Sequence, residues 1–232
     1  MKDYCNFENM KIELKITNDG SSTLYVPQLN EHYHSIHGAI TESLHVFIKN
    51  GFYKIYKPKI DIIEMGFGTG LNAFLTFLET LKQKIFVYYY SIDLFPLNEY
   101  LFKKLNYIEV MNIDKNIKKY FYKFHECEWN KDYVVNDYFV LHKRLIDITA
   151  KNPEGKFDIV YYDAFAPSKQ PEVWSEEVLK KFYNVMRCKG IFTTYCASGK
   201  VKRALHNIGF EVNVLPGPPN KREMINAIKI KQ

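Results

Sequence analysis

Hydrophobic and polar positions follow two different patterns along the chain, and the first occupies the N-terminal part. Residues 10–35 alternate apolar and polar side chains around an Asn-Asp-Gly turn, which predicts a β-hairpin. Residues 38–52 place apolar side chains at helical spacing, with Thr41 as the N-cap and Gly51 at the C-terminal stop. We therefore expect residues 1–52 to form an extension, a hairpin and a helix packed on the main domain.

The second pattern, strands alternating with helices, begins near Lys59. The continuous apolar run IDIIEM at 60–65 is typical of a parallel strand buried on both faces. Further predicted strands are 86–93, 157–165, 190–196, 211–217 and 223–230, and predicted helices are 71–81, 94–105, 175–186 and 198–210. Only turn residues separate the last two strands, so they must pair antiparallel at one edge. The alternation predicts an α/β, Rossmann-like doubly wound sheet over 53–232. By analogy of fold, an edge hairpin is more typical of class I methyltransferases than of nicotinamide dehydrogenases.

A glycine loop follows the first of these strands. Gly66, Gly68 and Gly70 have the spacing G-x-G-x-G, whereas a dinucleotide fingerprint reads G-x-G-x-x-G. Glu64 precedes them, and its carboxylate would repel a pyrophosphate but suits a cation such as a methionine-derived sulfonium with its ammonium group. The glycines alone are weak evidence, since they also suit a plain turn.

Acidic residues recur where predicted strands end. Asp93 stands where a ribose-binding carboxylate is expected, and Asp147 is placed to accept from an adenine amino group. Asp163 ends the next strand. Ligands of open α/β sheets bind at the carboxyl ends of the strands, so with Glu64 we expect these acids to surround one site. Any one of them alone is also consistent with a helix cap.

Composition narrows the setting of the protein. No apolar run is long enough to span a bilayer, and no signal peptide is visible, so we expect a cytoplasmic protein without a membrane partner. The four cysteines are scattered, which predicts reduced, buried or half-buried thiols rather than a disulfide framework or a zinc site. Net charge is +6, and residues 196–232 hold seven basic side chains against two acidic ones. This basicity is compatible with a polyanionic partner without requiring one.

Two further motifs carry a family resemblance, DAFAPSKQPEVW at 163–174 and KREM at 221–224. With them, and with EMGFGTGLN at 64–72, nearly the whole chain resembles the tRNA 5-methylaminomethyl-2-thiouridine methyltransferases. That family methylates the wobble uridine of certain tRNAs. The resemblance implies tRNA as the partner and S-adenosylmethionine as the methyl donor. The residues it places on the cofactor side are Glu64, Gly66, Gly68, Gly70, Asn72, Asp93, Asp147, Tyr33 and Ser35.

Asp163 falls on the family's catalytic acid, and the chemistry gives a reason for an acid there. The nucleophile is a primary alkyl amine, which is protonated and inert in water at pH 7. A carboxylate beside it attracts the ammonium and accepts its proton. Phe165 and Pro167 are expected to wall the site. The resemblance also assigns Lys221, Arg222 and Glu42 to the substrate side. Asn220 stands where relatives usually have glycine, which leaves the local turn in question.

Relatives often carry a C-terminal FAD-dependent oxidoreductase. Residues 1–232 contain no second dinucleotide fingerprint. The chain therefore resembles the stand-alone form, for which we expect no flavin, no obligate protein partner and 5-aminomethyl-(2-thio)uridine as substrate. His32, His34 and His37 are close enough in sequence to suggest a metal site, but no step of the reaction needs one, so we expect no metal.

Two rival functions remain open from the sequence. A polyamine aminopropyltransferase also combines a glycine loop with strand-end acids and places an Asp beside an amine. The DAFAP and KREM motifs and the basic C-terminal segment disfavour it. A non-catalytic RNA-binding module on the same scaffold would be expected to lack the cofactor acids, which are all present.

Overall fold

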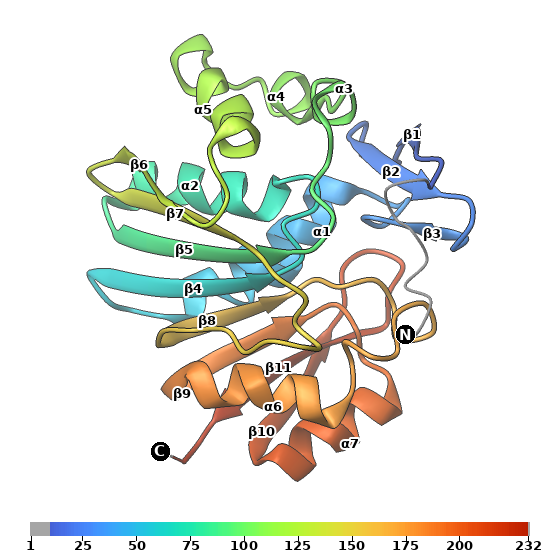
Figure 1. Cartoon of the computed structure of the whole chain (residues 1–232), viewed down its shortest axis with the longest axis vertical. Coiled ribbons are helices and arrows are strands. Elements are labelled where there is room, and N and C mark those ends of the chain that lie inside the picture. The colour runs from blue at the N-terminus through green and yellow to red at the C-terminus, as the bar shows by residue number, and fades with distance from the viewer. Residues whose placement is uncertain (1–9, 232) are drawn as a thin grey trace.

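A computed structural model, which describes residues 10–231, is organised around an eight-stranded sheet (Figure 1). The strand order is β10-β11-β9-β8-β4-β5-β7-β6. Its strands are β4 (Lys59–Met65), β5 (Phe86–Asp93), β6 (Asp132–Asn136), β7 (Phe139–Leu145), β8 (Phe157–Tyr162), β9 (Met186–Thr194), β10 (Phe210–Pro216) and β11 (Glu223–Lys229). The five central strands β9, β8, β4, β5 and β7 run parallel, and β10 and β11 form the expected antiparallel pair at one edge. The predicted α/β fold class is confirmed.

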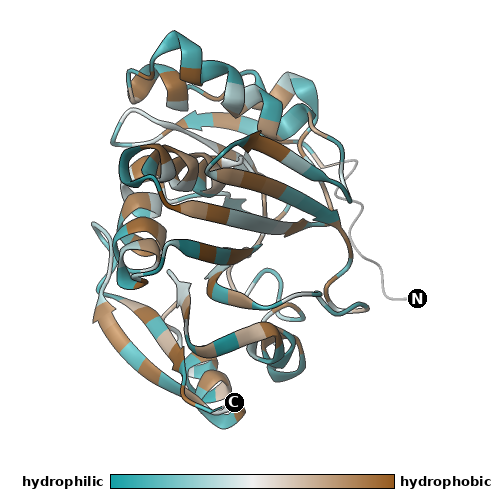
Figure 2. Ribbon diagram, turned by 90° about the vertical axis from the view of Figure 1, so that its left-hand side faces the viewer, coloured by the Kyte–Doolittle hydropathy of each residue, from teal (hydrophilic) through white to brown (hydrophobic). Residues whose placement is uncertain are grey.

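Helices cover both faces of this sheet, so there are two hydrophobic cores. One face carries α2 (Leu71–Gln83), α4 (Tyr107–Val110) and α5 (Lys115–Glu126), and the other carries α6 (Glu176–Val185) and α7 (Gly199–Ile208). Consecutive residues of β4 point to opposite sides: Ile62 belongs to the first core and Ile63 to the second. This explains why 60–65 lacks polar alternation, and the central strands are correspondingly hydrophobic in Figure 2.

The N-terminal hairpin forms as predicted, from β1 (Glu13–Ile16) and β2 (Ser22–Val26). A short third strand, β3 (Glu31–His32), joins it and was not predicted. The following helical segment comprises α1 (Ala39–Ser43), a π-helical stretch η2 (Leu44–Lys49) and a 3₁₀ turn η3 (Phe52–Lys54). Figure 1 shows β1–β3 as a separate small sheet beside the main one.

The prediction that Thr41 is the N-cap of this helix is wrong. The helix begins at Ala39, after Gly38, and Thr41 lies inside it. Both the backbone N–H and the hydroxyl of Thr41 donate to Oδ2 of Asp19, at 2.9 and 2.8 Å. The carboxylate of Asp19, from the hairpin turn, thus satisfies a first-turn N–H that local sequence leaves open. A contact between two elements replaced the local cap.

Other features were not predicted from the sequence. The helix expected over 94–105 is reduced to α3 (Glu99–Phe102), which Asn98 caps by accepting from the N–H of Leu101. Strand β6 adds a second antiparallel edge beside β7. Cys188 is exposed rather than buried, and Cys5 lies outside the described residues. Between residues 10 and 231, no helix has both the length and the apolar character needed to cross a membrane.

Candidate active site

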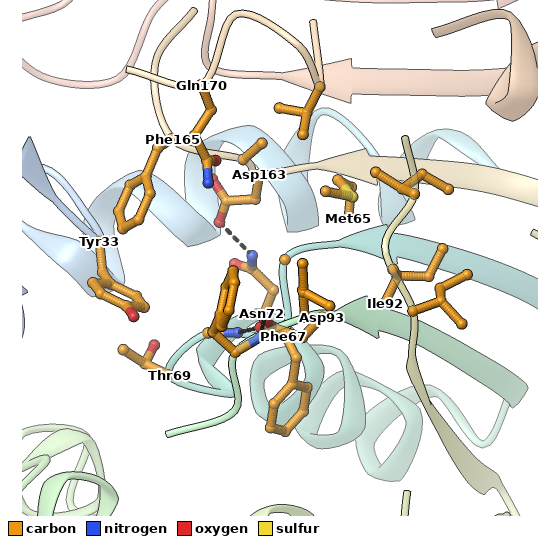
Figure 3. Close-up of a pocket in the computed structure, with 18 of the residues that line it drawn as sticks. Tyr33, Met65, Phe67, Thr69, Asn72, Ile92, Asp93, Asp163, Phe165 and Gln170 are labelled. Carbon is orange, nitrogen blue, oxygen red and sulfur yellow. Dashed lines mark hydrogen bonds between the residues drawn. The ribbon is translucent and has the colours of Figure 1, made fainter. Parts of the chain in front are cut away.

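A pocket with about 980 Å³ of empty space opens where β4, β5, β7 and β8 end (Figure 3). Its walls combine the glycine loop, the loops after β5, β7 and β8, and two residues from the N-terminal extension, Tyr33 and His34. Eight of the residues expected at the site line it: Tyr33, Gly66, Gly68, Asn72, Asp93, Asp147, Asp163 and Phe165. The carboxyl ends of four parallel strands therefore meet at one cavity, as the topology requires.

The glycine loop is held against two of the acids. Gly66 has φ of 92°, and a Cβ built there would lie 2.8 Å from the backbone oxygen of Asp163. A side chain at this position would therefore push β4 and β8 apart. Gly68 donates its N–H to Oδ2 of Asp93 at 2.9 Å, and Phe95 donates to Oδ1 at 2.9 Å. These bonds fix the direction of the Asp93 carboxylate.

The pKa of Asp93 is raised above its ordinary value by burial, which the N–H groups of Gly68 and Phe95 partly offset. Asp147 is oriented differently, through its own loop. Its Oδ1 accepts from the N–H and the hydroxyl of Thr149, at 2.8 and 2.7 Å. Both bonds use the same oxygen, and no bond to Oδ2 of Asp147 is formed within residues 10–231.

Asp163 faces the pocket and is held by one amide. Oδ2 of Asp163 accepts from Nδ2 of Asn72 at 2.8 Å, as the dashed line in Figure 3 marks. Burial, reinforced by the negative charge of Glu42, raises the pKa of Asp163 to about 7, and Asn72 and Lys221 oppose that rise. A carboxyl group with this pKa exchanges its proton near neutral pH, which suits an acid-base role.

Three other expected residues form a cluster that borders the pocket without lining it. Nζ of Lys221 lies 2.6 Å from Oε2 of the buried Glu42, and Oε1 of Glu42 accepts from the N–H of Ser35 at 3.1 Å. Lys221 also lies over the ring of Tyr195, at 4.2 Å from its centroid. The charges of Lys221 and Glu42 both reach Asp163 and act on its pKa in opposite directions.

The remaining expected residues lie away from the pocket wall. Arg222 has a side chain that is 94% exposed, and neither Pro167 nor Gly70 lines the cavity. Asn220 adopts φ of 65°. This left-handed conformation is one that glycine and asparagine accept most readily, so the asparagine preserves the turn.

Glu64 lies beneath the pocket rather than in its wall. Its side chain is fully buried, Oε2 accepts from the hydroxyl of Ser91 at 2.6 Å, and Oε1 has no partner among the described residues. Burial raises the pKa of Glu64 to about 8, so at pH 7 the group is mostly protonated. Without a ligand, the Glu64 carboxyl group therefore largely lacks the negative charge that we inferred from the sequence. A bound cation would stabilise its ionised form.

Some pocket residues were not selected from the sequence, and they stand next to motifs that were. His34 was considered only as a metal ligand. In the structure Nε2 of His34 lies 2.7 Å from the hydroxyl of Thr69, and burial lowers the pKa of His34 to about 4, so the ring is neutral. Within the described residues, no three His, Cys, Asp or Glu side chains are placed to hold a metal ion. Phe67, Thr69 and Gln170 also line the pocket. They belong to the motifs at 64–72 and 163–174, from which only other residues were predicted to be at the site.

Comparison with known proteins places this site in a family. Residues 111–230 match the family described as S-adenosyl-L-methionine-dependent methyltransferase. The chain is 32% identical over 222 residues to the tRNA 5-methylaminomethyl-2-thiouridine biosynthesis bifunctional protein MnmC of Leptospira borgpetersenii serovar Hardjo-bovis (strain JB197). That alignment covers 84% of this chain but only 32% of the relative, so the chain spans about a third of its length.

Solved structures agree with this placement. The crystal structure of MnmC2 from Aquifex aeolicus superposes with a TM-score of 0.78 at 25% identity, covering 98% of this chain and 73% of that one. A probable spermidine synthase from Corynebacterium glutamicum reaches a TM-score of 0.53 at 12% identity, covering 96% and 77%. At that identity the second likeness shows a shared fold alone.

Proposed function

Since the chain belongs to the S-adenosyl-L-methionine-dependent methyltransferase family, we propose that it methylates the primary amine of 5-aminomethyl-(2-thio)uridine at the tRNA wobble position. The product is 5-methylaminomethyl-(2-thio)uridine. The observation that carries the proposal is Asp163, a carboxyl group with a pKa of about 7 that faces the pocket from the DAFAPSKQPEVW loop. The relative's name, which refers to 5-methylaminomethyl-2-thiouridine of tRNA, supports this choice of amine.

The residues around the pocket fit S-adenosylmethionine. The Asp93 carboxylate, oriented by Gly68 and Phe95, would accept from the ribose hydroxyls. Apolar Leu94, Ile146 and Ile148 line the cavity together with Asp147 and would hold the adenine. Oε1 of Glu64 and Oδ1 of Asn72 are buried acceptors without a partner in the described chain, and they suit the ammonium end. When bound, the cofactor supplies a methyl group already activated by the positive sulfur.

Asp163 prepares the amine for attack. A primary alkylammonium has no lone pair to donate until it loses a proton. Because the pKa of Asp163 is about 7, a substantial fraction of the carboxyl is ionised at neutral pH and accepts that proton. Asn72 keeps the carboxylate aimed across the pocket, and the rings of Tyr33 and Phe165, with centroids 5.0 Å apart, close one side against water. The protein's contribution is therefore proton removal and alignment.

We assign no flavin to this step, because methyl transfer from a sulfonium to an amine involves no redox change. We assign no metal, because the sulfonium supplies the electrophile and Asp163 supplies the base. On the substrate side, Lys221 and Glu42 act on Asp163, and the exposed Arg222 is available to a tRNA phosphate. Tyr33 and His34 line the pocket from the N-terminal extension that we propose for residues 1–52.

The direct test is methyl transfer from labelled S-adenosylmethionine to tRNA that carries 5-aminomethyluridine, in the presence of EDTA. Wild type should form 5-methylaminomethyluridine, and Asp163→Ala should lower the rate by roughly 10²- to 10⁴-fold. Asp137→Ala, at an exposed turn, is the matched control and should retain activity. No transfer to this tRNA, with activity instead on a diamine and a decarboxylated donor, would replace the proposal with aminopropyl transfer.

A further inference from the structure

Gln170 brings an unused amide to the reacting end of the pocket. It follows the turn after β8, where its N–H donates to the carbonyl of Ala166 at 3.0 Å. Figure 3 shows its side chain entering the pocket from the same side as Asp163, with the amide pointing toward that residue. Among residues 10–231, the amide of Gln170 forms no hydrogen bond to another side chain or to the backbone, so its oxygen is available to a ligand.

Several backbone carbonyls near Gln170 already accept hydrogen bonds from the protein. Nε1 of Trp174 donates to the carbonyl of Phe165 at 2.7 Å, and the hydroxyl of Tyr195 donates to the carbonyl of Ala164 at 2.8 Å. The carbonyl of Ala166 accepts from Lys169 and Gln170. Oδ2 of Asp163 is occupied by Asn72, and no bond to its Oδ1 is formed in the described chain. Oδ1 of Asp163 and the amide oxygen of Gln170 are therefore available to a bound amine, while Oδ1 of Asn72 is assigned to the ammonium end of the cofactor.

We propose that Gln170 is a specificity-determining residue that limits the reaction to one methyl group per amine. This inference rests on the proposed function. A neutral primary amine has two N–H groups and one lone pair. After Asp163 has taken the ammonium proton and passed it to water, its carboxylate accepts one N–H of the neutral amine and Gln170 accepts the other. The lone pair then points away from both, toward the methyl donor. The nitrogen–carbon bond forms, the carbon–sulfur bond breaks with its electron pair going to sulfur, and the new ammonium loses one proton to Asp163 or water.

The product cannot be held in the same way. A secondary amine has a single N–H, so a second reactive alignment places the new methyl group against one of the two acceptors. That acceptor then loses its hydrogen bond inside the pocket, which disfavours the second transfer by about 10- to 100-fold. Removal of the amide should relax this discrimination, because methionine has a similar length and offers no strong acceptor.

The test compares nucleosides from tRNA treated with excess S-adenosylmethionine until the first transfer is complete, analysed by mass spectrometry. Wild type should stop at the monomethyl product. Gln170→Met should accumulate the dimethyl product, its second transfer rising about 10- to 100-fold relative to its first. Gln170→Glu, which keeps an acceptor, should again stop at one methyl. Ser168→Ala, in the same loop but exposed, is the matched control and should behave as wild type.

Each remaining outcome is decisive. Strict monomethylation by Gln170→Met, at whatever rate the first transfer proceeds, would overturn the role of Gln170 and leave the proposed function standing, as would dimethylation by wild type. Failure of wild type to methylate this tRNA at all would overturn the proposed function, and with it this inference.

Discussion

Nδ2 of Asn72 donates to Oδ2 of Asp163 over 2.8 Å, which joins the first turn of α2 to the end of β8. The bond stabilises the ionised carboxylate, since it opposes the rise that burial imposes on the pKa of Asp163. It also leaves the other oxygen of Asp163 facing the pocket. The two residues are 91 positions apart in the chain, and the sequence assigned them to different ligands.

Asn72→Leu should move the acidic limb of the rate profile to higher pH. Without the donated hydrogen bond the pKa of Asp163 rises further, by about 1 unit, and a higher pH is needed to ionise it. The measurement is the single-turnover methylation rate between pH 5.5 and 9. An unchanged limb would show that Asn72 does not act on the ionisation of Asp163.

Glu42 and Lys221 should shift that same limb in opposite directions. Glu42→Gln removes a negative charge that raises the pKa of Asp163, so the limb should move to lower pH. Lys221→Met removes a positive charge that lowers this pKa, so the limb should move to higher pH. Lys118→Met, which breaks the exposed pair between Lys118 on α5 and Glu109 on α4, serves as the charge-matched control for Lys221→Met. Shifts of the same sign in both variants would contradict the electrostatic account.

The ionised Asp163 should lower the free energy of unfolding of the protein at neutral and higher pH. Its pKa is about 7 when folded, against an ordinary value of 3.8, so between these values the folded state binds a proton that the unfolded state has released. The stabilising contribution is full below about pH 4 and is lost as pH rises through about 7. At pH 8 the free energy of unfolding of Asp163→Asn should therefore exceed that of wild type by roughly 1–3 kcal/mol. Urea titration measures this difference as a higher midpoint for the variant.

That gain should shrink as the pH of the urea titration is lowered toward 5. Loss of methylation together with the gain in stability would show that the acid is retained for activity. A variant less stable than wild type at pH 8 would contradict the raised pKa.

Gly66→Ala should be much more damaging than Gly20→Ala, although both glycines have positive φ, of 92° and 83°. The added methyl at Gly66 meets the backbone oxygen of Asp163 at 2.8 Å, whereas no atom lies within 4 Å of a Cβ at Gly20. We expect a loss of roughly 2–4 kcal/mol or of cofactor binding at Gly66, and about 1 kcal/mol at Gly20. Thermal unfolding and cofactor titration measure both. Equal losses of stability in the two variants would show that the positive φ, and not the contact with Asp163, accounts for the effect of Gly66→Ala.

The chain's local patterns determined most of the fold. Continuous apolar strands alternating with helically spaced segments predict the parallel sheet, and the short turn between the last two strands predicts the edge hairpin. Both signals are local, because they depend on the order and spacing of neighbouring residues. The same patterns did not predict β6 or the start of α1, where a partner strand and the Asp19 carboxylate decide the outcome.

At the site, the sequence predicted which acids lie near one another, and the tertiary structure decided the position and the pKa of each. Glu64 is the penultimate residue of β4 and Asp163 directly follows β8, yet Glu64 is fully buried outside the pocket wall while Asp163 lines it. Gln170 and His34 reach the wall only because distant loops bring them there. Burial, and the charges of Glu42 and Lys221, set the pKa of Asp163. Burial and these electrostatic effects depend on distances between residues that are far apart in the chain. Local sequence patterns do not contain those distances.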